Sequence, residues 1–135
     1  MKFQKEIKFL IENEGFEKKR KKISSQQIER IKSFYPNAPT DYLDFLTEIG
    51  AGQFKNSQYE FKSFLFDLSD IGLNGIYEIP PNIVFFGDNL IGDFVGFDLS
   101  SEKETVVKLN HESGMIINTK LSFCDFFRMQ IGLQQ

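Results

Sequence analysis

The apolar residues of this chain change their spacing near residue 50, and this change constrains the fold more than any other feature. Over residues 3–14, 24–35 and 39–49, apolar side chains recur at intervals of three and four, which predicts three amphipathic helices. Beyond residue 50, short apolar runs alternate with turn residues, and residues 122–131 return to helical spacing. This order of helices, then strands, then one helix predicts an α+β fold.

The middle of the chain contains several stretches with strand character. In the first, Tyr59, Phe61 and Leu65 alternate with polar residues, although Phe64 and Phe66 interrupt the alternation. The others are residues 83–86, 94–97, 104–109 and 115–118. The first of these is uniformly apolar, which is typical of a strand buried on both faces. Turns of hairpin length cannot connect parallel strands, so the sequence predicts a mainly antiparallel sheet of about five to six strands.

Residues at the helix boundaries support this division of the chain. Ser24 and Gln27 have the spacing of a capping box, and Ser122 and Asp125 repeat that spacing at the start of the last helix. Pro39 suits the first turn of the third helix, where a missing N–H is not needed. We therefore expect N-terminal helices before the sheet and one C-terminal helix after it.

Phenylalanine dominates the apolar composition, with 16 Phe and no Trp among 135 residues. This composition predicts a core built largely from aromatic rings. We expect Tyr42, Phe45, Phe85 and Phe97 to be buried, because each lies on the apolar side of a predicted helix or strand. A chain of this length can bury such a core as one domain over residues 1–135.

The charge and the cysteine count narrow the functional classes. A formal net charge of −3 argues against a protein that binds nucleic acid mainly through phosphates, because such binding needs a basic face. Cys124 is the single cysteine, so no internal disulfide can form. The N-terminus is charged where a signal peptide is apolar, and no apolar run reaches the ~20 residues of a membrane span. We expect a cytoplasmic protein with no membrane partner.

A basic run at residues 18–22 is the exception to the acidic balance. Such runs occur in nucleic-acid patches and targeting signals, and also in solvated connections between helices. Because the rest of the chain is acidic, we favour the connection, and the sequence leaves any further role of these residues open.

Two residues have side chains that often take part in catalysis. His111 lies in a predicted hairpin turn, and we interpret it as an exposed turn residue because no catalytic partner is adjacent in sequence. Cys124 lies one turn into the last helix, where a packed thiol is expected more often than a reactive one. One His and one Cys are too few for the usual structural zinc site.

Asp88, Asp93 and Asp98 recur every five residues and invite comparison with metal ligands or an acid–base pair. Their spacing differs from that of a calcium loop, whose ligands occupy alternate positions. Each flanks a predicted strand, where Asp commonly accepts hydrogen bonds from turn N–H groups. We expect no catalytic residues, no cofactor and no metal site.

Several segments, in order, resemble the SUKH superfamily. They are residues 35–46, which lead through Pro and Tyr into a Phe-Leu helix, the Gly-Ala-Gly at 50–52, the strands with Gly-Asp at 83–89 and 92–98, Val106-Val107, and the Ser-Phe-x-x-Phe start of the last helix at 122–126. The resemblance covers residues 24–131, and no single motif in it is specific. Ala38 stands where relatives usually have Leu, and the Trp residues common in relatives are absent.

The resemblance implies an α+β sheet with flanking helices and a role without catalysis. Bacterial SUKH members are similar to immunity proteins that neutralise polymorphic toxins, often nucleases or deaminases, and a fungal branch regulates cell-wall synthesis. The matching positions are core and turn residues, so they imply the fold and not a binding site.

Our leading hypothesis is an immunity protein that binds a toxin domain in the cytoplasm. The alternatives are a regulatory or scaffold module of the same fold and, from another class, an enzyme that uses the three aspartates. For a basic toxin cleft, Asp67, Asp70 and Glu78 are candidate contact residues, because they flank a turn-rich segment. The same residues are equally typical of solvated turns.

Overall fold

The structure is a computed structural model that describes residues 2–14 and 20–133. Within these ranges the elements are α1 (Gln4–Glu14), α2 (Ser25–Phe34), α3 (Thr40–Glu48), β1 (Glu60–Phe66), the short 3-10 helix η1 (Ser69–Ile71), β2 (Ile83–Asp88), β3 (Phe94–Asp98), β4 (Thr105–Leu109), β5 (Ile116–Ser122) and α4 (Phe123–Ile131). The predicted α+β order is confirmed.

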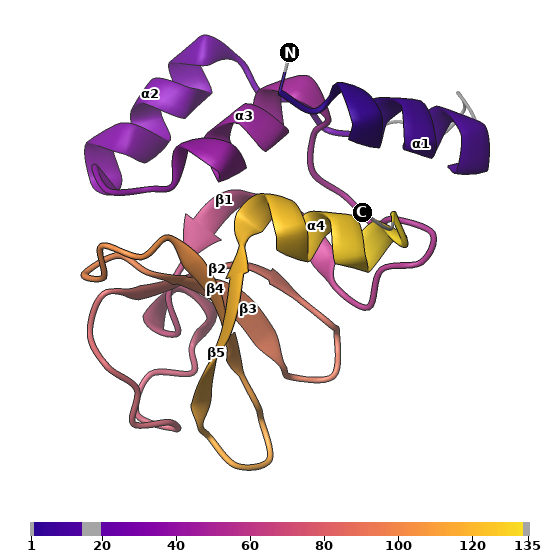
Figure 1. Cartoon of the computed structure of the whole chain (residues 1–135). Helices are drawn as coiled ribbons and strands as arrows, with labels where there is room; N and C mark the ends of the chain where they lie inside the picture. Colours follow the sequence, from indigo (N-terminus) through magenta and orange to yellow (C-terminus); the bar gives the residue numbers. More distant parts are fainter. Residues whose placement is uncertain (1, 15–19, 134–135) are drawn as a thin grey trace.

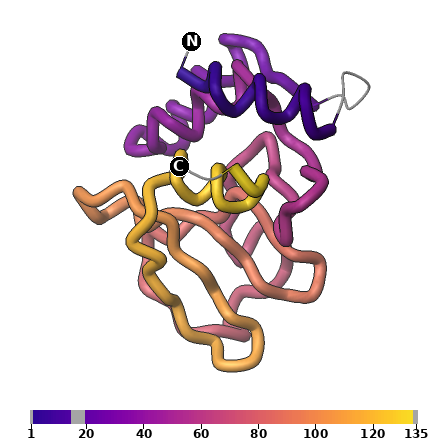
Figure 2. The backbone as a smooth tube through the Cα atoms, turned by 45° about the vertical axis from the view of Figure 1, so that its right-hand side comes forward, coloured from indigo at the N-terminus to yellow at the C-terminus, as the bar shows by residue number. Residues whose placement is uncertain are grey.

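The five strands form one sheet in the order β1-β2-β3-β4-β5, and every neighbouring pair is antiparallel. The sheet is therefore a meander, as the short turns predicted. Figure 1 shows α1, α2 and α3 above the sheet and α4 between α1 and the strands. The turned view in Figure 2 shows the same arrangement, with all four helices on one side.

The second face of the sheet is covered by the long connection between β1 and β2, which lies at the lower left of Figure 1. Leu73, Tyr77 and Ile79 from this connection pack against a cluster that includes Phe85 and Leu109. Strands β2 and β3 are buried on both faces for this reason, which confirms the prediction for residues 83–86.

The aromatic core lies between the sheet and the helices. Phe45 of α3 is at its centre and contacts six other rings, those of Phe3, Tyr42, Phe54, Phe61, Phe123 and Phe127. The four residues predicted to be buried are confirmed, since Tyr42, Phe45, Phe85 and Phe97 expose at most 1 % of their surface.

The helix ends agree closely with the sequence. The Ser24 side chain accepts a hydrogen bond from the Gln27 N–H, and the Gln27 side chain accepts one from the Ser24 N–H, so the capping box is confirmed. Ser122 caps α4 by accepting from the Asp125 N–H. Pro39 is the N-cap of α3 and lies one position before the helical turn in which we expected it.

Strand β1 contains a large bulge. Phe61 pairs with Gly87 and Phe66 pairs with Phe85, so residues 62–65 lie opposite Phe86 alone. The hydroxyl of buried Tyr42 lies 2.8 Å from the Lys62 carbonyl oxygen and 3.3 Å from that of Phe64. Helix α3 therefore satisfies carbonyl groups that the bulge removes from the ladder.

The described part of the basic run has structural contacts. Arg20 pairs with Glu14 and lies over the Phe54 ring, 4.1 Å from its centroid. The backbone of Lys21 exchanges hydrogen bonds of 3.0 and 2.9 Å with Ala51. These contacts agree with a connection between α1 and α2. The first two residues of the run, Lys18 and Lys19, lie outside the described residues.

Candidate protein-binding site

Three adjoining hollows follow the corner where the α2–α3 connection meets the sheet. Their volumes are about 340, 560 and 410 Å³. The first two share Phe34 and Tyr35, and the second and third share Pro36 and Leu99, so they form one surface. We call this surface the corner groove; its residues come mainly from the segments 34–40, 63–67 and 97–104.

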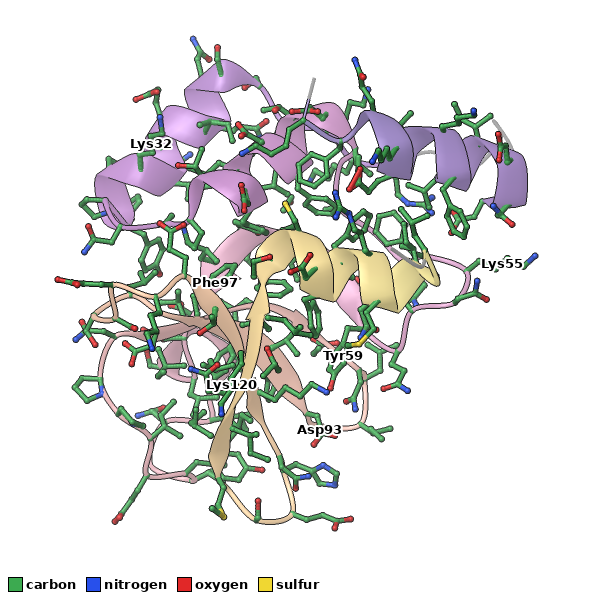
Figure 3. The ribbon with its side chains drawn as sticks, in the orientation of Figure 1. Lys32, Lys55, Tyr59, Asp93, Phe97 and Lys120 are labelled. Atoms are coloured by element: carbon green, nitrogen blue, oxygen red, sulfur yellow. The ribbon has the colours of Figure 1, made fainter. Side chains whose placement is uncertain are left out.

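Figure 1 shows how the chain brings these segments together. The connection between α2 and α3 and the orange β3–β4 turn lie on the same side of the molecule, one above the other. Figure 2 shows the same pairing from another direction. In Figure 3, Lys32 on α2 and Phe97 near the end of β3 mark the helix side and the sheet side of this corner.

One end of the groove is apolar. Phe34, the last residue of α2, is 71 % exposed, and Phe64 is 52 % exposed. Both line the same hollow together with Ile31 and Leu65. Phe64 lies in the β1 bulge and is exposed, whereas the two residues that follow it, Leu65 and Phe66, are both buried. The bulge and the helix end thus place two exposed rings on one wall.

The other end of the groove is acidic. Asp67, Asp98, Glu102 and Glu104 line the two larger hollows, and no described Lys, Arg or His lines either one. Among residues 2–14 and 20–133, no ion pair within 4.0 Å involves any of these four carboxylates. Asp98 accepts hydrogen bonds from the Ser100 N–H and hydroxyl, which leaves its charge uncompensated. This end therefore favours a cationic partner group.

The structure brings two of the three predicted contact residues together. Asp67 accepts from the Ser69 hydroxyl at 2.6 Å and from the Asp70 N–H at 3.0 Å, and Asp70 accepts from the Asp67 N–H at 2.8 Å. The bond from Ser69 is the main cause that lowers the pKa of Asp67 below its ordinary value. Burial raises the pKa of Tyr35, and the charges of Asp70 and Asp67 raise it further.

Asp67 and Asp70 therefore both stabilise the turn after β1 through hydrogen bonds. Asp67 also lines the groove, and Asp70 lies beside it. Glu78 is exposed in the β1–β2 connection and lines none of the three hollows. Residues that the sequence did not single out, Phe34 and Phe64, contribute the apolar wall. For Phe64 the sequence did contain an indication of an irregular strand, because the alternation of apolar and polar residues fails at that position.

His111 lies in the β4–β5 turn, as expected, but it is half-buried and not exposed, because it has a partner that the sequence did not suggest. Its Nδ1 lies 2.6 Å from Asp93 Oδ1, and its backbone N–H donates to the same oxygen at 2.9 Å. The Asn89 amide donates to Oδ2 at 3.0 Å. Burial alone would raise the pKa of Asp93, but these hydrogen bonds lower it below its ordinary value. The two hairpin tips are thereby joined.

Asp88, Asp93 and Asp98 do not converge. Asp88 pairs with Phe94 at one end of the β2–β3 hairpin, whereas Asp98 pairs with Ile83 at the other. Figure 3 shows Asp93, which precedes β3, well apart from Phe97 near the end of that strand. Asp88 and Asp98 each accept a hydrogen bond from the N–H two residues further on, which supports the turn interpretation for these two, whereas Asp93 accepts from the His111 N–H in the β4–β5 turn. Within the described residues, no group of three or more His, Cys, Asp or Glu side chains is placed to hold a metal ion.

Cys124 is half-buried in the first turn of α4. Burial raises the pKa of its thiol to about 12, and the nearby Asp41 contributes to the rise. The thiol therefore stays protonated at neutral pH, as expected for a packed cysteine. Over the ranges that the structure describes, no helix combines the length and apolar character needed to cross a bilayer.

Taken together, these features define an α+β domain with a helix-covered meander sheet and a groove suited to another protein. The family model described as SMI1-KNR4 cell-wall, SUKH_6, matches residues 37–127. The chain belongs to this family, which confirms the SUKH resemblance. Searches of curated proteins and of solved structures found no match.

Proposed function

We propose that this protein is an immunity protein, which binds a polymorphic toxin domain of the nuclease or deaminase type in the cytoplasm and neutralises it by occlusion. Family membership supports a protein-binding role, because SUKH members are generally immunity or regulatory proteins. The observation that carries the proposal is the corner groove, where two exposed rings adjoin four carboxylates that form no ion pair with a described residue.

Occlusion requires a rigid scaffold and a complementary surface, and it needs no reacting group. The aromatic core and the capped helices supply the scaffold. If the toxin is a nuclease, its cleft is basic, since it must hold phosphates. Asp67, Asp70 and Glu78, with the groove carboxylates, would then speed association and help to select the partner.

We further propose that the protein acts without a catalytic site, cofactor or metal. His111 is engaged with Asp93 in a contact between hairpins, and the Cys124 thiol is protonated. The second ring nitrogen of His111 lies 3.9 Å from the Glu112 carboxylate, beyond hydrogen-bond distance. A nucleophile would need to lie within hydrogen-bond reach of that nitrogen.

A second candidate is a regulatory or scaffold module in cell-wall synthesis control. The observation in its favour is the description of the matching family, which names the cell wall. Both candidates bind a protein, so they differ in the partner and not in the chemistry.

Co-expression tests the proposed function. We expect a toxin domain to be encoded by a neighbouring gene; this domain is expressed alone and together with this protein, and growth is followed. We expect growth to be restored, and the purified pair to form a stable complex. If growth is not restored and no complex forms, the immunity role is excluded and the regulatory module is left.

The contact residues are tested separately within the same complex. The triple variant Asp67→Asn, Asp70→Asn, Glu78→Gln should slow association several-fold at low salt and much less at high salt, since screening weakens steering. Because Asp67 and Asp70 also hold the turn, its thermal melt is compared with that of the native protein. An unchanged association rate at low salt would exclude these three residues as the contact surface.

A further inference from the structure

The two ends of the corner groove differ in chemistry, because the exposed aromatic rings lie at one end and the acidic side chains at the other. The hollow with Phe34 and Phe64 also contains Lys21 and Arg30 in its lining, whereas the two larger hollows have only acidic charged residues. The apolar wall is therefore at one end and the unpaired negative charge at the other. A ligand that complements both must itself be amphipathic and basic.

The rings of Phe34 and Phe64 are only partly covered by other described residues. Phe64 contacts Phe66 with a ring-centroid distance of 5.9 Å but keeps half of its surface in solvent, and Phe34 keeps more. Single exposed apolar residues are ordinary on protein surfaces, but two rings lining one hollow form a patch. Aromatic residues in pockets contribute most to binding energy at protein interfaces.

The negative charge at the acidic end of the groove is also not paired with any described cation. Several of the described cations are already paired with carboxylates: Lys2 with Asp41 and Asp44, Arg20 with Glu14, Lys62 with Glu60, and Arg128 with Glu6. Glu102 and Glu104 are exposed and form no ion pair with any described residue. The groove thus attracts cations from outside the chain.

We propose that the corner groove binds an extended segment of a partner protein in which an aromatic or large apolar side chain is followed, on one side, by basic residues. That side chain packs between Phe34 and Phe64, and the basic residues lie against Asp67, Asp98, Glu102 and Glu104. The proposal rests on the proposed function in that the partner is a protein, and it specifies which surface is used and what chemistry the partner presents.

Other exposed apolar residues provide a matched control surface. Leu90 and Ile91 are 74 % and 69 % exposed in the β2–β3 turn, at the end of β3 opposite to Asp98. They line none of the three hollows. The variant Ile91→Ser therefore removes an exposed apolar side chain as Phe34→Ser does, but at the far end of the sheet.

Titration of the isotope-labelled full chain with defined peptides tests the proposal by NMR. Three capped peptides of equal length are used: Lys alternating with Phe, Glu alternating with Phe, and Lys alternating with Ser. We expect the Lys–Phe peptide to bind most tightly and to shift amide signals within residues 34–40, 63–67 and 97–104. Phe34→Ser should weaken this binding about tenfold, and Glu102→Gln with Glu104→Gln about two- to fivefold.

The amide spectra of the variants establish that each remains folded, and Ile91→Ser should bind as the native protein does. Shifts centred on the hairpin tips, equal binding of the Glu–Phe peptide, no binding of the Lys–Phe peptide, or equal effects of Phe34→Ser and Ile91→Ser would each overturn the proposal. Rescue of growth is a separate readout. Peptide binding in the groove without rescue removes only the immunity role, and rescue without such binding removes only the groove.

Discussion

At the scale of single residues, the sequence predicted burial well wherever an apolar residue lay in a clear periodic pattern. Tyr42, Phe45, Phe85 and Phe97 are all buried. Glu6 shows what such patterns miss, since it lies among the charged residues of α1 and is 1 % exposed. Its carboxylate accepts from Arg128 at 2.7 Å, across 122 positions of sequence. Pairing at that distance depends on how α1 and α4 pack, which no local pattern encodes.

Phe45 is the residue on which the core depends most. Truncation in Phe45→Ala leaves a cavity among six rings, so we expect the free energy of unfolding to fall by about 3–5 kcal/mol. Chemical denaturation followed by circular dichroism measures it. Ile91→Ala, at an exposed position, should change stability by less than about 0.5 kcal/mol. A loss below about 1 kcal/mol for Phe45→Ala would show that the ring is not tightly packed.

At the scale of elements, helix ends and strand positions followed from the sequence, whereas register did not. The pattern at Phe64 and Phe66 broke the expected alternation, and the structure explains this break by the β1 bulge. The Tyr42 hydroxyl donates to the bulge from α3, 2.8 Å from the Lys62 carbonyl oxygen. The apolar wall of the corner groove could not be predicted, because it needs both the bulge and the end of α2 beside it.

The bulge makes Tyr42→Phe informative. Burial raises the pKa of Tyr42, so its hydroxyl stays neutral and can donate. Its removal leaves the Lys62 carbonyl without this donor and should cost about 1–3 kcal/mol of stability. Amide exchange measured by NMR should accelerate at residues 62–65 more than in β3. Uniform acceleration over the sheet would contradict a local role for this hydrogen bond.

The contact between the hairpin tips gives a pH dependence. The folded state lowers the pKa of Asp93, so its carboxylate stabilises the fold at pH values above the unfolded pKa of about 3.9. That contribution is lost as the pH falls through the lowered folded pKa. Asp93→Asn should cost about 1–3 kcal/mol at neutral pH, and the difference from the native protein should shrink below about pH 4.

Urea unfolding of both proteins at a series of pH values measures this difference. Glu112→Gln is the matched control, because this carboxylate neighbours His111 but is 83 % exposed. A difference that stays constant down to pH 3 would show that Asp93 is not stabilised in its charged form.

At the scale of the whole molecule, a different layer of chain covers each of the two faces of the sheet. The helices cover one face and the β1–β2 connection covers the other, and both pack on β2 and β3. The fold class and the family followed from the order of the elements and from recurring core positions. The binding surface did not follow from them, because immunity and regulatory proteins of one fold differ in exposed residues.

Because both layers depend on the same strands, we expect residues 1–135 to unfold as one domain in a single cooperative transition. Far-ultraviolet circular dichroism follows the helices, and amide NMR signals follow the connection over residues 67–82. The two denaturation curves should coincide. An earlier transition for the connection would show that it forms a separate layer and not part of one cooperative unit.

The central claim is that this SUKH-family protein binds a toxin domain through its corner groove, and calorimetric titration of the purified pair tests it most directly. We predict that the native protein and Ile91→Ser bind the toxin domain that we expect a neighbouring gene to encode with the same affinity, whereas Phe34→Ser binds about tenfold more weakly. Absence of binding by the native protein, or equal affinity of Phe34→Ser and Ile91→Ser, would contradict the claim.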